Sequence, residues 1–380
     1  MVRNALLFTL TICVCWASAK AELRVGFGEA DITPDVKGAR PVWLAGYGTG
    51  RRATGVHDPL MARCVVLKHA GQKIALVSVD LVGLQYPETL KVRDKLRDFR
   101  YVVVSSTHNH EGPDVVGIWG RSPIQRGVDE AYLRLVVDRI VGAVKEADKS
   151  AVAATARYGT AQDESLLGDS RLPKVYDGVL RAIRFTRTSD KQTCGILVQW
   201  NCHPEAMGSK NTLVTADFPY ATVDALKKRF RCPVAYFTGA VGGLMAPPDG
   251  KIKDDAGKVL QEGDFEFARV YGQQVAELAV RAIEAAEPIR LTPISVSARS
   301  IQLPVKNQYY RLSHALRILR RDAYVWTGDY EKRGDPLTPE NAKTSTMAVA
   351  TEVGYLRLGE LDVACVPGEI YPELVYGKDQ

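Results

Sequence analysis

Short apolar runs rich in β-branched residues alternate along this chain with segments whose apolar residues recur at helical spacing. The short runs predict strands at residues 23–28, 62–68, 73–79, 152–159, 179–185, 233–238, 294–303, 354–358 and 361–366, with two more that begin at residues 101 and 196. The longer segments predict helices at residues 87–99, 129–147, 217–230, 265–286 and 308–323. This interleaving indicates the α/β class, a mixed β-sheet core with flanking helices.

The order strand, helix, strand over residues 73–106 indicates a βαβ-like unit. In open α/β sheets ligands bind beyond the carboxyl ends of strands, so we expect the functional site at the strand C-terminal ends. Asp80 and His108 both occupy such ends, and Asp80 is interpreted as a turn or helix-start carboxylate. Gly26-x-Gly28 does not predict a dinucleotide site, because Asp31 stands at the third glycine position.

Potential metal ligands follow three of the apolar runs. The run from Tyr101 leads into His108-Asn-His110, the run from Ile196 leads into His203, and the last run leads into Pro367-Gly-Glu369. Because successive strand residues point to opposite faces, we expect His108 and His110 to share a face, with Cβ atoms about 6–7 Å apart. Two histidines and a carboxylate from separate strand ends match a catalytic zinc site, which takes three protein ligands and leaves one position open. We therefore expect His108, His203 and Glu369 to hold the ion.

Such a zinc ion would polarise a carbonyl oxygen and lower the pKa of a bound water to about 7. His110, next to the ligand His108, is placed to stabilise an oxyanion or to protonate a leaving group, so it is the catalytic candidate. A serine hydrolase is not favoured, because the chain has no Gly-x-Ser-x-Gly elbow. Spacing alone leaves amide, ester and phosphoester hydrolysis open.

Composition and charge bear on the partners and the location of the protein rather than on its chemistry. The formal charge is +6 over 380 residues without a basic run, so nucleic acid is not an expected partner. Residues 1–21 have the pattern of a signal peptide, with Arg3, an apolar run and cleavage after Ala19 or Ala21, so a secreted or periplasmic protein is expected. No later run of about 18 apolar residues predicts a membrane span, although peripheral membrane contact stays open.

Five cysteines remain after the signal segment, and they lack metal-binding spacing. They are interpreted as buried apolar residues, with one disulfide left open. They are Cys64, Cys194, Cys202, Cys232 and Cys365.

Seven motifs in order give the chain a resemblance to the catalytic domain of the neutral/alkaline, non-lysosomal ceramidase family. They are Val25–Thr33, Leu44–Tyr47, Val77–Asp80, Ser106–Pro113, Asn201–Pro204, the glycine-rich turn up to Pro247, and Pro367–Glu369. The resemblance implies a zinc amidase for lipid amides such as N-acyl sphingoids. It assigns His108, His203 and Glu369 as ligands and His110 as the second histidine of the pair. The family's ligand tyrosine has no match here, so neither Tyr371 nor Tyr376 is assigned.

The chain departs from the family where the family carries a serine, because Gly243-Leu-Met-Ala246 offers no hydroxyl. Three readings follow: water activated by the metal attacks directly, the substrate is not ceramide, or the protein is a non-catalytic relative that binds metal and recognises a lipid or glycan. A metal-dependent phosphoesterase is a further alternative. We expect residues 22–380 to form a single ceramidase-like domain, without the family's C-terminal immunoglobulin-like domain.

Overall fold

The computed structural model describes residues 21–172 and 174–376. Its helices are α1 (Tyr86–Asp94), α2 (Glu130–Ser150), α3 (Phe218–Phe230), α4 (Phe265–Glu284), α5 (Gln308–Ala315) and α6 (Pro372–Tyr376), with short 3-10 turns at Glu164–Leu166 and Asn341–Lys343. Its strands are β1 (Arg24–Asp31), β2 (Gly55–Val56), β3 (Met61–His69), β4 (Gln72–Val79), β5 (Tyr101–Ser106), β6 (Val152–Gln162), β7 (Gly168–Asp169), β8 (Val179–Arg187), β9 (Thr193–Trp200), β10 (Leu213–Val214), β11 (Val234–Thr238), β12 (Met245–Ala246), β13 (Glu287–Ile289), β14 (Ile294–Val305), β15 (Tyr324–Val325), β16 (Met347–Leu358) and β17 (Leu361–Cys365).

A mixed sheet of nine strands carries the fold, in the order β11-β9-β8-β6-β1-β3-β4-β5 with β13 beside β6. Two parallel pairs, β4–β5 and β9–β11, lie at its two edges, and its other neighbours are antiparallel. The sheet's halves are joined at β1–β6 by only two residue pairs. Apolar residues of both halves, such as Leu67, Ile74 and Phe185, share one buried cluster, so the sheet is bent upon itself. The bend brings the edges together, and the hydroxyl of Thr238, the last residue of β11, donates to the carbonyl of Thr107, which follows β5, at 2.7 Å.

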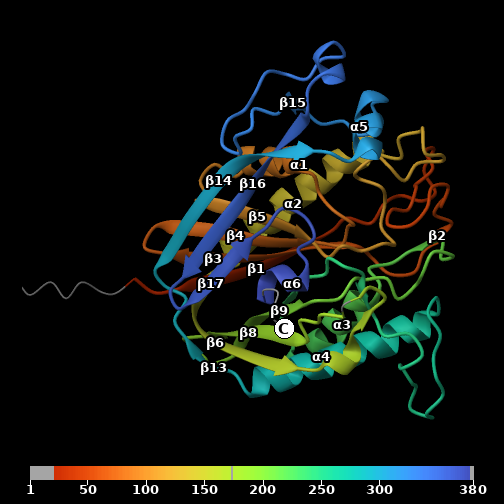
Figure 1. Ribbon diagram of the computed structural model, residues 1–380. Coiled ribbons are helices and arrows are strands. Elements are labelled where there is room, and N and C mark those ends of the chain that lie inside the picture. Colours follow the sequence, from red (N-terminus) through yellow and green to blue (C-terminus); the bar gives the residue numbers. More distant parts are fainter. Residues whose placement is uncertain (1–20, 173, 377–380) are drawn as a thin grey trace, which may run out of the picture.

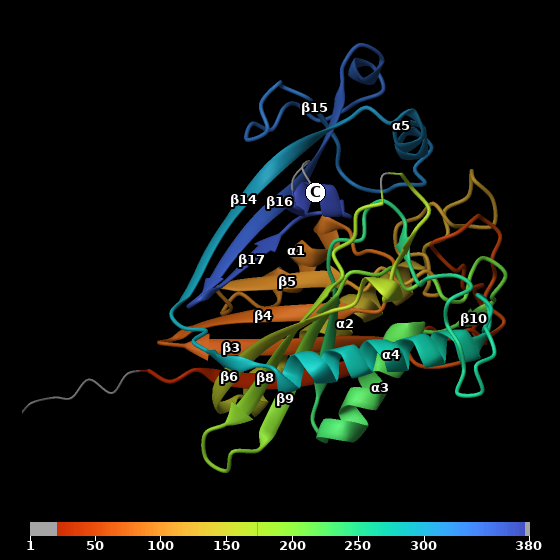
Figure 2. The same cartoon turned by 60° about the horizontal axis from the view of Figure 1, so that its bottom comes forward.

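Helices cover the outer faces of the bent sheet (Figures 1 and 2). Helix α2 packs on β1 and β3 with residues such as Val136 and Ile140, while α3 and α4 pack on the half that contains β8, β9 and β11. The Gly26-x-Gly28 pair serves this packing, because a Cβ at Gly26 would lie 1.8 Å from the Ala147 carbonyl oxygen and one at Gly28 would lie 2.2 Å from that of Ala143. These glycines admit the backbone of α2 rather than a nucleotide.

The last part of the chain, residues 294–365, forms a second sheet of four strands in the order β14-β16-β15, with β17 beside β16. Its Leu356 and Leu358 share the buried cluster of the large sheet. Glu352 on β16 accepts a hydrogen bond from the Tyr101 hydroxyl at 2.5 Å and pairs with Arg93 at 2.8 Å. The two sheets are therefore joined by both apolar and charged contacts.

The sequence pattern predicted the α/β class with a mixed sheet correctly, but two helices end early. Helix α1 stops at Asp94 rather than at residue 99. Helix α5 stops at Ala315 rather than at residue 323, since Arg317 has a left-handed backbone (φ 58°) and Ile318 and Leu319 turn back into the interior. Periodicity continues through such a break because the buried side chains after it still recur at a similar spacing.

Three further expectations meet the structure in different ways. The five described cysteines are free thiols, so the open disulfide is not formed among them. The predicted signal peptide falls almost wholly on residues outside the described ranges. Among the described helices, none combines the length and apolar character that crossing a bilayer demands.

A buried ion pair fixes the carboxyl end of β4 to β3. Asp80 accepts two hydrogen bonds from Arg63 Nη1, at 2.9 and 2.7 Å, and one from the Met61 amide at 2.9 Å. Neither side chain of the pair is more than 4% exposed. The carboxylate expected at a turn is thus a structural anchor beneath the functional end of the sheet.

We predict that Arg63→Leu lowers the free energy of unfolding by about 3–5 kcal/mol, because it leaves the Asp80 carboxylate buried without its cation. Urea denaturation measures the loss. Arg357→Leu, which breaks the exposed pair with Asp362, is the control and should leave the midpoint unchanged. The double variant Arg63→Leu/Asp80→Leu should recover much of the loss, and failure of Arg63→Leu to exceed the control would contradict the prediction.

Candidate metal centre

The two histidines of the first motif lie beyond the strand, in the turn that follows it. Strand β5 ends at Ser106, and His108 has a left-handed backbone with φ 66°. The expectation that strand alternation places His108 and His110 on one face is therefore wrong, because the strand has already ended. Their side chains meet through the turn instead, with the two Nε2 atoms 3.4 Å apart. A non-glycine residue at positive φ is strained, which is typical of functional sites.

The buried side chain of Asn109 holds this turn in place. Its amide donates to the Thr215 carbonyl at 2.8 Å, and its carbonyl accepts the Glu111 amide at 3.0 Å. The His110 amide reaches the Pro204 carbonyl at 3.3 Å. The turn after β5 is thus tied to the segment that contains His203.

His203 comes three residues after β9 and is buried. Its backbone amide and its Nδ1 both reach the Met245 carbonyl, at 2.8 and 2.7 Å. The His203 ring lies 4.8 Å from the His108 ring and 5.7 Å from the His110 ring, between centroids. The second strand end therefore meets the first, as expected from the sequence.

The Nδ1 atoms of all three rings point away from their common centre toward oxygen atoms. His108 Nδ1 lies 2.5 Å from the Val82 carbonyl, and His110 Nδ1 lies 3.0 Å from Glu205 Oε1. A carbonyl oxygen only accepts, so Nδ1 of His108 and of His203 carries the proton and the neutral ring presents an Nε2 lone pair. This is the arrangement by which proteins orient histidines that bind metal.

Glu369 completes the cluster from the far end of the chain. Its Oε1 lies 3.1 Å from His108 Nε2 and its Oε2 lies 3.4 Å from His203 Nε2. The segment is held by the Gly242 amide, which donates to the Ile370 carbonyl at 2.9 Å. The structure thus brings together His108, His203 and Glu369, and their role as metal ligands stays a prediction.

The sequence predicted a catalytic role for His110 rather than a role as a metal ligand, but its ring nitrogen lies close enough to those of His108 and His203 for it to be a ligand as well. Nitrogen atoms of His108, His110 and His203 lie within 4.8 Å of one another, and these three could hold an ion among the residues the structure describes. Sequence reasoning gave no role to Glu205, the group that orients His110. Its position two residues after His203 was the available signal.

Charge and burial act in opposite directions within the cluster. Contacts with His108 and His203 hold the pKa of Glu369 well below its usual range. Burial by itself would lower the pKa of His108, but the contact with Glu369 outweighs it and raises that pKa. For His110, burial dominates and lowers the pKa. The site therefore favours a neutral His110 beside a carboxylate that stays ionised.

The glycine-rich loop before β2 packs against His110. A Cβ at Gly46 would lie 2.3 Å from the ring carbon Cγ of His110, so only glycine fits there. Tyr47 meets the His110 ring edge-on at 5.2 Å, and Arg51 Nη2 donates to the His110 carbonyl at 2.7 Å. The Tyr47 hydroxyl also donates to the Glu205 carbonyl at 3.3 Å, so the loop holds both His110 and the segment after His203.

Ala246, at the position where the sequence resemblance implies a serine, follows Met245, which contacts His203. Ala246 forms β12 with Met245, whose carbonyl accepts the His203 Nδ1 proton. The methyl group of Ala246 can neither attack a carbonyl nor donate a proton. Any nucleophile in this site therefore comes from elsewhere.

Asp217 fastens the segment after His203 to the start of α3, where it is the N-cap. Its Oδ1 accepts the Phe218 amide at 2.6 Å and its Oδ2 accepts the Met207 amide at 3.1 Å. The carboxylate is buried, and burial raises its pKa to about 7. It is a structural group that titrates near neutral pH.

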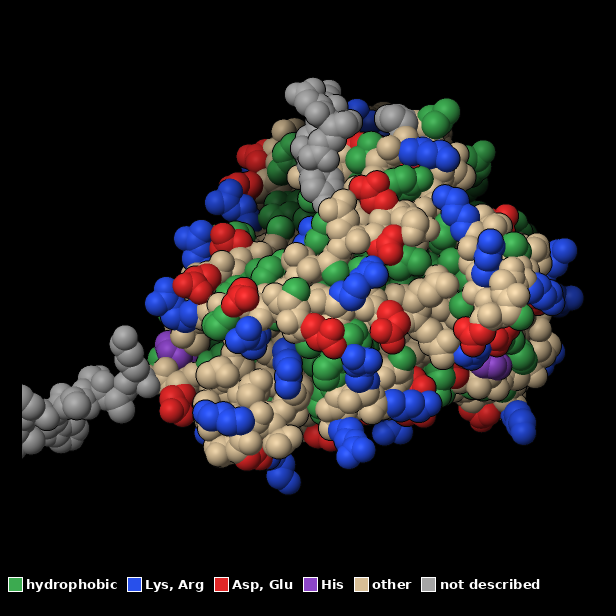
Figure 3. Space-filling model, turned by 90° about the horizontal axis from the view of Figure 1, so that it is seen from below, with side chains coloured by type: hydrophobic (Ala, Val, Ile, Leu, Met, Phe, Trp, Pro, Cys, Tyr) green, Lys and Arg blue, Asp and Glu red, His purple; other side chains and the backbone are tan. Residues whose placement is uncertain are grey.

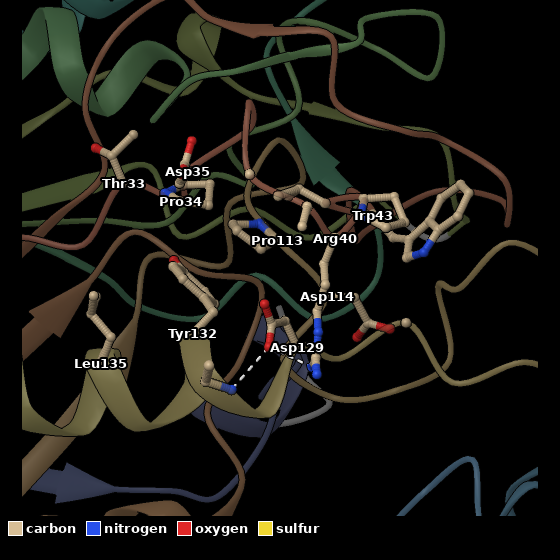
Figure 4. Close-up of a pocket in the computed structure, with 16 residues that line it drawn as sticks. Thr33, Pro34, Asp35, Arg40, Trp43, Pro113, Asp114, Asp129, Tyr132 and Leu135 are labelled. Atoms are coloured by element: carbon tan, nitrogen blue, oxygen red, sulfur yellow. Dashed lines mark hydrogen bonds and ion pairs between the residues drawn. The ribbon is translucent and has the colours of Figure 1, made fainter.

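Pro113 also lines a separate pocket of about 290 Å³ (Figure 4). Its lining includes Trp43, Tyr132 and three aspartates, but none of the four clustered side chains. Asp114 accepts the backbone amides of Val116, Gly117 and Trp119, and Asp129 caps α2. Both carboxylates already have structural partners, so the pocket offers no free ligand group from Asp114 or Asp129.

Comparison with known proteins identifies the fold. No family model and no curated protein matches the sequence. Among solved structures, the chain is similar to the neutral ceramidase from Pseudomonas aeruginosa, with a TM-score of 0.72 and 18% identity over 92% of this chain and 63% of that one. It is similar to a ceramidase complexed with C2, with a TM-score of 0.70 and 18% identity over 92% of this chain and 64% of that one. The resemblance seen in the sequence motifs is thus confirmed at the level of the fold, over somewhat less than two thirds of those chains.

Asp217→Asn should change how stability depends on pH. Since the folded-state pKa is raised above the usual 3.8, the folded protein binds this proton more tightly, and the stability it contributes is lost as the pH rises from about 4 to about 7. The asparagine variant keeps the cap without this loss. The thermal midpoint of the variant minus that of the native protein should therefore increase between about pH 4 and 7 and should be constant above about pH 8. A difference that is constant from pH 4 to 8 would contradict the raised pKa.

Proposed function

We propose that the protein is an exported, zinc-dependent hydrolase of the neutral ceramidase-like type that cleaves an amide bond, with N-acyl sphingoids as the first candidate substrates. The observation that supports the proposal best is the convergence of His108, His203 and Glu369 beside His110. The ceramidase fold makes an amide the leading bond class. Export rests on the signal pattern of residues 1–21.

The spacing of the ligand atoms fits a tetrahedral ion. Zinc-to-nitrogen distances of about 2.0–2.1 Å in a tetrahedron separate neighbouring ligand atoms by about 3.3–3.4 Å. The separations of 3.1 Å between His108 Nε2 and Glu369 Oε1 and of 3.4 Å between His203 Nε2 and Glu369 Oε2 are close to that value. Imidazole and carboxylate donors without thiolates suit zinc at a catalytic site.

When bound, zinc would polarise the substrate carbonyl and acidify water. The chain's own groups would handle the proton. Glu205 fixes His110 from Nδ1, so His110 Nε2 faces the centre, where it would take a proton from the attacking water and return it to the leaving amine. The absence of a hydroxyl at Ala246 favours direct attack by water over a covalent serine intermediate.

Metal content tests the ligand assignment. We expect the protein to bind one zinc ion, measured by mass spectrometry of the metal after dialysis, and His108→Ala/His203→Ala to lose it. His314→Ala is the matched control, because the His314 ring lies outside the cluster, with its Nε2 3.0 Å from the Arg321 carbonyl oxygen, and the variant should keep the ion. His110→Ala separates two roles: retention of zinc with loss of turnover assigns His110 to proton transfer, while loss of zinc makes it a ligand. Equal metal content in the double variant and the control would overturn the site.

Turnover tests the reaction. We expect hydrolysis of a fluorogenic N-acyl sphingosine or of a simpler amide in a panel, loss of that activity with a chelator, and recovery on addition of zinc. Release of phosphate from aryl phosphates instead would favour the phosphoesterase alternative. Stoichiometric zinc without turnover of any amide would favour an inactive relative that recognises a lipid or glycan, to which Ala246 lends support.

A further inference from the structure

We propose that helix α5 and the loop beside it form a docking surface for membranes rich in anionic lipid. The α5 surface is defined by Tyr309, Leu312 and Leu316, with the basic residues Lys306 and Arg317 at its two ends. The inference goes beyond the proposed hydrolysis and does not depend on it.

The helix turns its apolar stripe outward. Tyr309, Leu312 and Leu316 are spaced as i, i+3 and i+7 and are 83%, 57% and 50% exposed. The opposite side of the helix holds it to the protein: Tyr310 packs on a small apolar cluster, and Arg311 Nη2 donates to the Ala342 and Ser345 carbonyls at 2.9 and 3.1 Å. The polar contacts face inward and the apolar side chains face solvent, the reverse of an ordinary surface helix.

The neighbouring loop, residues 117–126, extends this surface. Arg126 Nη1 donates to the Ile318 carbonyl at 2.7 Å, which joins the loop to the segment that follows α5. The loop exposes Ile124 by 76% and Ile118 by 37%. Both ribbon views show α5 beside these gold-coloured loops, at the end of the molecule where β4 and β5 finish (Figures 1 and 2). The same loop continues from the turn that carries His108 and His110.

The charge of this region selects an anionic partner. Residues 303–321 and 115–128 contain seven arginines and lysines and no acidic residue. Arg126 and Arg320 pair with Glu130, and within the described residues Lys306, Arg121 and Arg317 have no acidic partner. By contrast, the underside around α3 and α4 shows basic and acidic side chains interspersed (Figure 3). Protruding apolar side chains flanked by arginine and lysine are the composition of helices that lie in the headgroup region of a bilayer.

Binding to sucrose-loaded vesicles tests the proposal. The full-length protein should sediment with vesicles of phosphatidylcholine containing about one third phosphatidylserine, less with phosphatidylcholine alone, and less at high salt. Leu312→Ser/Leu316→Ser should lower the partition coefficient by about tenfold or more on the anionic vesicles. Lys306→Glu/Arg317→Glu should abolish the preference for phosphatidylserine. Tyr220→Ser on α3 and Lys145→Glu on α2 are matched controls, exposed elsewhere, and should bind as the native protein does.

Three outcomes would overturn the proposal: no sedimentation of the native protein, equal sedimentation of the α5 variants and the controls, or a native dimer that Leu312→Ser/Leu316→Ser converts to a monomer. The last result would assign the surface to contact between copies. Turnover of a water-soluble amide is measured on the same variants and should be unchanged. A failure of docking is thereby distinguished from a failure of the proposed hydrolase.

Discussion

The convergence of His108 Nε2 and His203 Nε2 on the Glu369 carboxylate, with His110 Nε2 next to His108, is the constraint on which the functional end of this protein depends. These three contacts are 3.1 to 3.4 Å long, and a proton or a cation between a carboxylate and an imidazole lone pair would stabilise such an approach. The backbone carbonyls of Val82 and Met245 hold two of the rings in the orientation that makes this approach possible. The contacts of the Nδ1 atoms with oxygen atoms outside the cluster therefore orient the rings, so that the Nε2 atoms of His108 and His203 face Glu369.

The bend of the large sheet supplies the position of these groups. His108 and His110 follow one edge strand, β5, and His203 follows β9, the neighbour of the other edge strand. In a flat sheet these strand ends would lie far apart. Because both halves bury apolar residues such as Ile74 and Phe185 in one cluster, the edges close on each other, and Thr238 bonds to the Thr107 carbonyl across the junction. Core packing and site geometry are thus consequences of the same bend.

The alanine at position 246 and the exposed apolar side chains of α5 both bear on how the proposed hydrolase would work. Under the proposed function, a site without a serine nucleophile would rely on water and on an ion held by the cluster. The surface that would bring a lipid substrate to this site lies on the loop that continues from His110 and on the helix packed against it. One segment of the chain, residues 107–128, would then carry both the histidines of the site and part of the surface by which a membrane lipid reaches it.

The sequence by itself determined the local elements and the candidate ligands. Short apolar runs and the helical spacing of apolar residues depend on neighbours in the chain, so β3, β4, α2 and α3 were predictable. Tertiary structure alone decided how the ligands meet. The positive φ of His108, the place of Glu205 beside His110 and the early end of α5 depend on contacts with residues far away in the sequence. Periodicity carries no information about such contacts, because a turn or a bend is fixed by what packs against it.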